Sequence, residues 1–370
     1  MKSSPQTAEP GRRNSIGALR LALAALVIYT HAFYLGGFGR EWLESWSGGL
    51  LSAGTLAVQC FFVLSGWLVA TSWRRQPHLG RFLWARGLRL LPALWVCLAV
   101  TAFVFTPLLC LTDRGGPASF FNLEPSAWGY VWRNLFLPRS QIAIGMMPVG
   151  GPWPGDWNGS LWTLFYEGAC YLMVAALGLG GLLSRWRLAG TALIVALLVL
   201  HIIVAGLHPS GLFGHLGRLY DTSGKLLTLH FLAGAAWAVW PAETAPLLRV
   251  PWLALLATLA LALSWHFPWQ VWLSPFLLPP ALLWLSRREL LADFERQAGG
   301  DYSYGVYLYG YPVQQVLAHF QVNQFGQAVY LAASLALALA CAVASWHLIE
   351  KPALALKSLA WPGRRATAAP

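Results

Sequence analysis

The sequence predicts an all-α membrane protein, a polytopic helical bundle of about ten transmembrane helices with its N-terminus and C-terminus in the cytoplasm. Of the 370 residues, 57% are hydrophobic and only 11% are charged, whereas about a quarter of the residues of a soluble domain are charged. The apolar residues also occur in runs of about 20, the length of one helix across the hydrocarbon core. Strand-like alternation between regular turns is absent from the sequence, which argues against an outer-membrane barrel.

The expected spans follow from the apolar runs and the loops between them. They are residues 16–35, 54–73, 88–111, 160–183, 188–207, 225–240, 250–266, 270–286, 304–320 and 328–349. The first run follows Arg12 and Arg13 but is longer than the apolar part of a usual signal peptide, so we expect it to be retained as a helix. The ranges 250–266 and 270–286 are short and flanked by prolines, so broken helices are an alternative there.

Positive charges set the expected orientation. If the N-terminus is cytoplasmic, 18 of the 25 Lys and Arg residues fall in cytoplasmic segments and six in outside segments, with Arg20 inside the first span. This asymmetry satisfies the positive-inside rule, so the net charge of +11 indicates topology and not a nucleic-acid partner. The chain then divides into a disordered cytoplasmic N-terminus (1–13), one transmembrane domain (14–353) and a cytoplasmic tail (354–370).

The five cysteines lie within apolar spans, and no pair has the spacing of a metal site. They are Cys60, Cys97, Cys110, Cys170 and Cys341. We interpret them as small core residues and expect no bound metal.

The longest loop, about 112–159, is expected outside the membrane. It carries Trp and Asp residues that suit a sugar, since flat rings stack on sugar faces and carboxylates bind hydroxyl groups. Anchoring at the membrane interface explains the tryptophans equally well.

A charged or titratable side chain within the bilayer is expensive and therefore indicates function. Arg20 and His31 lie on the first span, and 11 residues turn an α-helix about 20° past three full turns, so both share one face about 16 Å apart. This geometry suits a ligand threaded across the membrane, with its anion at Arg20 and its reactive end at His31. A snorkelling arginine and a hydrogen-bonded core histidine are the alternative.

Three further positions carry charge near or within the spans. Arg86 and Arg89 stand at i and i+3 at the start of the third span, so both guanidiniums can grip phosphate oxygens, although a plain positive-inside flank is the alternative. Glu167 lies about two turns into the fourth span, where it could orient His31, bind an acceptor hydroxyl or belong to a structural ion pair. Glu350 ends the last span, and an acid at a helix C-terminus opposes the macrodipole, so we expect it to pair with Arg86 or Arg89.

Several soluble-enzyme signatures are missing from the sequence. It has no Gly-x-Ser-x-Gly elbow, no Gly-x4-Gly-Lys-Ser/Thr loop, no Cys-x-x-Cys and no His-x4-Asp. Nucleoside triphosphatases, serine hydrolases and the usual soluble and glycerolipid acyltransferases are therefore disfavoured.

These positions together resemble integral-membrane acyltransferase family 3, which includes bacterial O-antigen and exopolysaccharide O-acetyltransferases. The resemblance covers about residues 14–353. The matching motifs are Arg20-x10-His31, the Phe61-Phe62-Val63-Leu64-Ser65-Gly66 run, Arg86-x-x-Arg89, Leu161-Trp162-Thr163-Leu164-x-x-Glu167, Asp301-Tyr302-Ser303-Tyr304 and Glu350-Lys351-Pro352. Many members carry a histidine two residues before the proline of the late Ser-Tyr motif, where this chain has Gly310, so His31 is left with more of the chemistry.

The resemblance implies transfer of an acyl group, usually acetyl, from acetyl-CoA to a hydroxyl of a glycan. His31 and Glu167 are then the expected catalytic residues, and His31 acts as general base or acyl relay. Acyl-CoA is expected at Arg20, Arg86 and Arg89 as a co-substrate, with no permanently bound cofactor. Support of the site is expected from Ser65, Trp162, Tyr304 and Glu350.

The expected setting is the bacterial inner membrane, with a multi-pass enzyme in the bilayer. Its acceptor would be O-antigen, exopolysaccharide or a lipid-linked sugar, and no nucleic acid would take part. Two alternatives from other classes stay open: a transporter or flippase of a lipid-linked or small substrate, and a structural subunit of a polysaccharide assembly complex. The sequence shows no repeated halves with paired helix breaks, which would favour the transporter.

Overall fold

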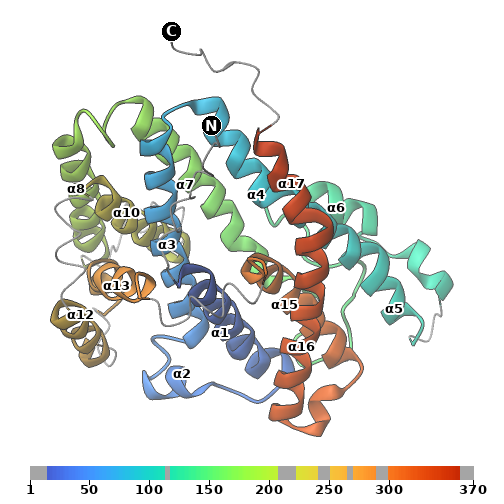
Figure 1. The fold of residues 1–370 in the computed structure, drawn as a ribbon. Coiled ribbons are helices and arrows are strands. Elements are labelled where there is room, and N and C mark those ends of the chain that lie inside the picture. The colour runs from blue at the N-terminus through green and yellow to red at the C-terminus, as the bar shows by residue number, and fades with distance from the viewer. Residues whose placement is uncertain are drawn as a thin grey trace, which may run out of the picture.

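A computed structural model describes residues 15–112, 117–206, 222–240, 251–264, 270–288 and 299–358, and these residues contain no β-strand. Within them, a helix occupies each of the ten predicted ranges (Figure 1). These helices are α1 (Ile16–Gly36), α3 (Ala53–Arg75), α4 (Leu79–Val100), α7 (Trp162–Leu179), α8 (Arg187–Gly206), α10 (Thr222–Val239), α12 (Pro251–Ser264), α13 (Gln270–Ser286), α15 (Ser303–His319) and α16 (Gln327–Ser345). The all-α fold class is confirmed. The expected disorder of residues 1–13 lies outside the described residues.

Among the residues that the structure describes, five helical stretches are long and apolar enough to cross a membrane. They are Ile16–Gly36, Ala53–Arg75, Leu79–Cys110, Gly159–Leu179 and Gln327–Ala355. The apolar parts of α8, α10, α12 and α13 are shorter, so the crossing number of ten stays a prediction. The prolines of α13 do not break it, because the helix runs continuously from Gln270 to Ser286.

Two helices extend more than five residues beyond their predicted limits. Helix α4 begins at Leu79 and continues through a π-helical turn (Thr101–Phe105) into α5 (Thr106–Cys110). Helix α16 continues through a second π-helical turn into α17 (Lys351–Ala355). The prediction that the last helix ends at Glu350 was therefore wrong, because Pro352 lies in the first turn of α17, where its missing N–H and ring are tolerated.

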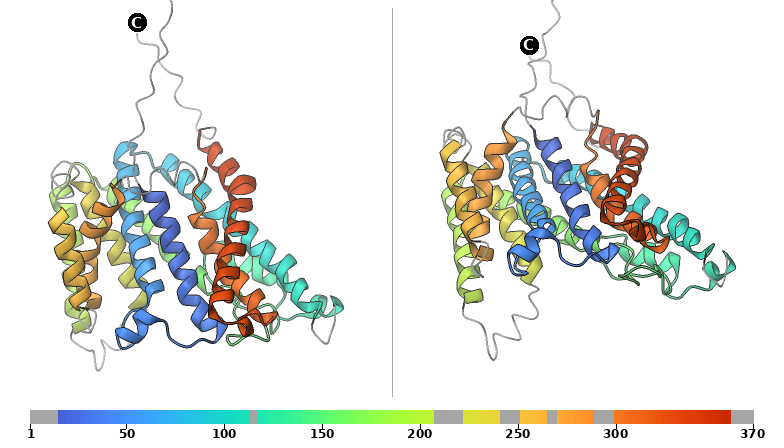
Figure 2. Two further views of the ribbon diagram at one scale, coloured as in Figure 1. Left: turned by 60° about the horizontal axis from the view of Figure 1, so that its bottom comes forward. Right: turned by 90° about the horizontal axis from the view of Figure 1, so that it is seen from below.

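Helix α15 lies at the centre of the bundle, packed against α1 and α16, while α8, α10, α12 and α13 gather on one side (Figures 1 and 2). The most extensive helix pair is α3 with α10. Glycines on both helices permit it: a Cβ at Gly66 would lie 1.9 Å from the Phe231 carbonyl oxygen, and a Cβ at Gly234 would lie 2.1 Å from the Val63 carbonyl oxygen. Small residues allow such close helix contact in membrane proteins.

The two ends of the bundle differ in chemistry. The start of α1 and the helix α17 lie at one end, which also holds Arg20, Arg86 and Arg89 and is called the arginine end below (Figure 2). The opposite end, called the loop end, holds the described part of the loop between α5 and α7, with η2 (Pro117–Asn122) and α6 (Ala127–Asn134). This segment is anchored on α15, since Asn158 donates to the Leu308 carbonyl at 2.9 Å and Gln315 donates to the Asp156 carbonyl at 2.7 Å.

All five cysteines are free thiols, and four of them are buried in the helix packing. Cys341 alone is partly exposed. Their burial agrees with the interpretation as small core residues.

Candidate active site

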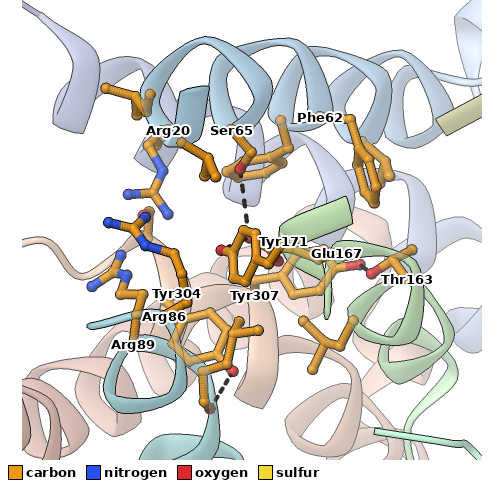
Figure 3. Close-up of a pocket in the computed structure, with 17 residues that line it drawn as sticks. Arg20, Phe62, Ser65, Arg86, Arg89, Thr163, Glu167, Tyr171, Tyr304 and Tyr307 are labelled. Carbon is orange, nitrogen blue, oxygen red and sulfur yellow. Dashed lines mark hydrogen bonds between the residues drawn. The ribbon is translucent and has the colours of Figure 1, made fainter. Parts of the chain in front are cut away.

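The described residues form a pocket where α1, α3, α4, α7 and α15 meet, enclosing about 720 Å³ with its open mouth included. Six of the nine residues predicted for the site line it: Arg20, Ser65, Arg86, Arg89, Glu167 and Tyr304. In Figure 3 the three arginines lie together on one side of the pocket, and Glu167 and Thr163 lie on the other. The fold therefore gathers side chains from five helices that the sequence keeps far apart.

A carboxylate that the sequence analysis quoted in a motif, but did not count among the site residues, joins two of the arginines. Asp301, directly before α15, binds Arg20 Nη1 at 2.7 Å and Arg89 Nη2 at 2.6 Å through its Oδ2 atom. Its other oxygen, Oδ1, accepts from the Ser303 hydroxyl at 2.5 Å. The signal that could have found Asp301 is an acid at the start of a span, at the depth where two other spans carry arginines.

The charge of Asp301 is secured by these neighbours. Burial raises the pKa of this carboxyl, but the guanidiniums of Arg20 and Arg89 and the hydrogen bonds from Ser303 more than offset the burial and hold the pKa well below its usual range. Asp301 is therefore an anion at neutral pH and neutralises part of the positive charge at this end of the pocket.

Arg89 is a structural member of this cluster as well as a pocket residue. Its Nη1 atom lies 3.6 Å from Glu350 Oε2, and the Ser345 hydroxyl donates to Glu350 Oε1 at 3.1 Å. The predicted pairing of Glu350 with an arginine of α4 is thus confirmed, with Arg89 as the partner. Glu350 contacts Arg89 but does not line the pocket itself.

Arg86 differs from its neighbour because it has no ion pair among the residues that the structure describes. Its guanidinium lies 5.9 Å from the ring centre of Phe82 and 5.7 Å from that of Tyr171. Its Nε atom is buried without a hydrogen-bond partner. An arginine with no ion pair among the described residues, on the wall of a pocket, can bind an anionic ligand there.

The opposite wall is polar but not cationic. Glu167 Oε1 accepts from the Tyr171 hydroxyl at 2.5 Å and from the Ser65 hydroxyl at 3.5 Å (Figure 3). Beside it, the hydroxyls of Thr163 and Tyr307 lie 2.5 Å apart. The pocket therefore suits an elongated ligand with an anion at one end and hydrogen-bonding groups farther in.

His31 lies outside this pocket, toward the loop end of α1. Its ring meets the ring of Tyr311 of α15 edge to face, with centroids 5.1 Å apart and planes at 75°. Arg20 and His31 both face the α15 segment, through Asp301 and Tyr311, as the helical spacing predicts. Tyr311 is in turn tied to the loop, since it interacts with Asp156.

No hydrogen bond or ion pair joins Glu167 to His31 in the part of the chain that the structure describes. The Glu167 carboxylate faces Tyr171 and Ser65 instead, so the idea that it orients the imidazole has no contact to support it. Trp162 also lies outside the pocket, with its ring 5.8 Å from that of Tyr166.

Two other positions bear on the histidine chemistry. A Cβ at Gly310 would lie 2.7 Å from Cγ1 of Ile28, so this position serves the close packing of α15 on α1. His230 of α10 is a buried imidazole that the sequence prediction passed over. Both of its nitrogens have partners, the Leu226 carbonyl at 2.7 Å and the Ser274 hydroxyl at 3.0 Å, so it ties α10 to α13.

Comparison with known proteins identifies the family to which the chain belongs. The model of a family described as an acyltransferase domain matches residues 13–347. The chain is 28% identical to the O-acetyl transferase of Shigella phage Sf6 over 357 residues, which cover 92% of this chain and 96% of that protein. It is also 28% identical to Nodulation protein 10 of Rhizobium leguminosarum bv. viciae over 367 residues, which cover 94% and 95% of the two chains.

A third relative is a putative peptidoglycan O-acetyltransferase of Bacillus subtilis (strain 168), 28% identical over 350 residues, which cover 83% of this chain but 51% of that longer protein. No solved structure matches the chain significantly. The family match over nearly the whole length, on a bundle with five helical stretches able to cross a membrane, shows that the chain belongs to the acyltransferase domain family and is a multi-pass membrane acyltransferase.

Proposed function

We propose that the chain transfers an acyl group, acetyl in the simplest case, from acyl-CoA to a hydroxyl of a glycan at the bacterial inner membrane. The observation that carries the proposal is the unpaired Arg86 in a pocket shared with Arg20 and Arg89. The names of two relatives, an O-acetyl transferase and a putative peptidoglycan O-acetyltransferase, support acetyl as the group and a glycan as the acceptor.

The donor enters at the arginine end, which the positive-inside rule places in the cytoplasm. Its phosphates bind Arg86 and recruit Arg20 and Arg89 at the mouth, where guanidiniums match phosphate geometry. Its arm extends toward Glu167, whose carboxylate accepts from amide or hydroxyl groups of the arm. This order suits CoA, since the nucleotide phosphates and the thioester lie at opposite ends of that molecule.

His31 performs the chemistry toward the loop end. As a neutral imidazole it takes the proton of the acceptor hydroxyl while the hydroxyl oxygen attacks the thioester carbonyl. The carbon–oxygen bond of the ester forms, the carbon–sulfur bond breaks, and the proton passes from His31 to the departing thiolate, which leaves as CoA thiol. In the relay variant His31 first receives the acyl group and then passes it to the hydroxyl.

The acceptor approaches from the loop end. His31 adjoins Tyr311 there, and Tyr311 interacts with the loop residue Asp156, which is held by Arg139. A glycan is the class of acceptor that combines free hydroxyls with a surface location. O-antigen, exopolysaccharide and lipid-linked sugars all fit this description.

The test uses purified protein in lipid nanodiscs with radiolabelled acetyl-CoA and extracted glycan. Wild type is expected to transfer label, and His31→Ala is expected to lose transfer while it still binds CoA. Absence of transfer by wild type with every glycan tried, together with movement of a lipid-linked sugar between leaflets, would favour the transporter. Full transfer by His31→Ala would remove His31 from the mechanism.

A further inference from the structure

The separation between the pocket and His31 raises the question of what lies between them. Helix α15 spans both, since Tyr307 lines the pocket and Tyr311 touches the ring of His31. These two residues are one helical turn apart, about 6 Å along the axis. Tyr307 is therefore the last pocket residue on α15 before the contact with His31.

Tyr307 is distinguished from the rest of α15 by its exposure. Between Ser303 and Gln315, Tyr307 is partly exposed and all the remaining residues of this helix are buried. It also forms part of the wall of the pocket. A tyrosine that served only to pack α15 would be buried like its neighbours.

The side chain of Tyr307 reaches across to two other walls of the pocket. Its hydroxyl donates to the Ser160 carbonyl at 3.1 Å and lies 2.5 Å from the Thr163 hydroxyl. Ser160 belongs to the 3-10 turn directly before α7, and Thr163 to the first turn of α7. Its ring meets Phe61 of α3 edge to face, with centroids 6.0 Å apart. One aromatic side chain thus connects α15 to α7 and α3 at the inner end of the pocket.

We propose that Tyr307 closes the inner end of the pocket and determines which acyl groups reach His31. This inference rests on the proposed function. The thioester end of bound acyl-CoA meets the Tyr307 ring, and a short acyl group passes when the hydroxyl leaves Ser160 and Thr163 and the ring turns aside. A longer acyl chain needs more space than the ring frees and is held back, so the site selects short-chain acyl thioesters.

The contacts of Tyr307 permit this movement. The movement breaks the hydrogen bond to the Ser160 carbonyl and the contact with the rotatable Thr163 hydroxyl, but it breaks no backbone hydrogen bond within a helix. The Oγ atom of Ser160, beside the carbonyl that holds Tyr307, is buried without a partner among the described residues. It offers a hydrogen-bond donor to a thioester carbonyl that has moved past the ring.

The test compares acetyl-CoA, butyryl-CoA and hexanoyl-CoA as donors for wild type, Tyr307→Phe, Tyr307→Leu and Tyr307→Ala in nanodiscs, with kcat/KM measured for each. Wild type is expected to prefer acetyl. Tyr307→Phe keeps the ring and is expected to keep that preference, whereas Tyr307→Ala is expected to raise the butyryl-to-acetyl ratio at least about tenfold, since pocket size discriminates by this order. Tyr309→Phe, a buried tyrosine of α15 outside the pocket, is the matched control.

The outcomes separate the two proposals. If wild type transfers no acyl group from any donor, the proposed function fails. If wild type transfers acetyl but a folded Tyr307→Ala variant with unchanged CoA binding keeps the wild-type ratio, the role of Tyr307 is overturned while the function stands. Equal use of all three donors by wild type, or a shift in Tyr307→Phe as large as in Tyr307→Ala, also overturns it. If the alanine variant does not fold, Tyr307→Leu gives the same comparison with a smaller cavity.

Discussion

Arg86→Ala is expected to weaken CoA binding and Arg89→Ala to lower the stability of the fold, although both arginines lie on one face of α4. Arg89 holds two carboxylates, Asp301 at 2.6 Å and Glu350 at 3.6 Å, and its side chain is only 14% exposed. Arg86 has no ion pair among the described residues. Arg89 is therefore held in the helix packing by its ion pairs, whereas Arg86 is available to bind a ligand.

The magnitudes follow from these contacts. Breaking a buried ion pair by removing one partner costs about 3–5 kcal/mol, so Arg89→Ala is expected to lower the free energy of unfolding by that order. Arg86→Ala leaves no carboxylate unpaired and loses only the contacts of its guanidinium with the rings of Phe82 and Tyr171, so it is expected to change this free energy by only about 1 kcal/mol. A hydrogen bond to a charged group is worth about 1.5–3 kcal/mol, so Arg86→Ala is expected to weaken CoA binding by about 10- to 100-fold.

The assay combines thermal unfolding of the purified variants with calorimetric titration of CoA in nanodiscs. Arg86→Lys is the matched control, since it keeps the charge but loses the planar fork, and intermediate affinity is expected. Unchanged CoA affinity in Arg86→Ala would refute the role of the free guanidinium. An equal loss of stability in Arg86→Ala and Arg89→Ala would refute the distinction between the two arginines.

Three further outcomes are expected. His31→Ala should abolish acyl transfer while CoA binding, measured by the same titration, stays within about twofold; a proportionate loss of binding would mean that His31 belongs to the donor site. The pKa of Asp301 is held below its usual value of about 3.9, so its ion pairs contribute stability above about pH 4 that is lost as pH falls through the lower folded-state pKa. Asp301→Asn should lack this acid-dependent loss of stability, measured by thermal unfolding at a series of pH values. An unfolding profile identical to that of wild type would contradict the assignment of this loss to Asp301. Gly66→Ala should lower the free energy of unfolding by about 3 kcal/mol, since its Cβ would lie 1.9 Å from the Phe231 carbonyl oxygen. Gly87→Ala on α4 is the control, because no atom lies within 4 Å of its Cβ, and thermal unfolding should show it to be neutral or slightly stabilising.

The positions of the helices could be predicted from the sequence because a membrane helix needs a long apolar run, and a run is a local property. The ten predicted ranges each hold a helix, and the largest errors lie at the polar ends of two of them. Helix α4 begins nine residues before the predicted start, and the last helix passes Glu350. Charged residues there are compatible with a helix but not with the lipid core, so hydropathy alone marks the span and not the helix.

The candidate site was only partly predictable. Helical spacing alone shows that Arg20 and His31 share a face and that Arg86 and Arg89 share another, because spacing along one helix is enough to define a face. What each side chain meets across that face depends on other helices. Only the tertiary structure shows that Asp301 and Glu350 pair with Arg89 and not with Arg86. It also shows that Glu167, among the described residues, accepts a hydrogen bond from Tyr171 and none from His31. Tyr307 lines the pocket one turn of α15 before the residue that contacts His31. The physical reason is that an ion pair or a hydrogen bond acts over a few ångströms, and only the packing of distant segments brings its two partners that close.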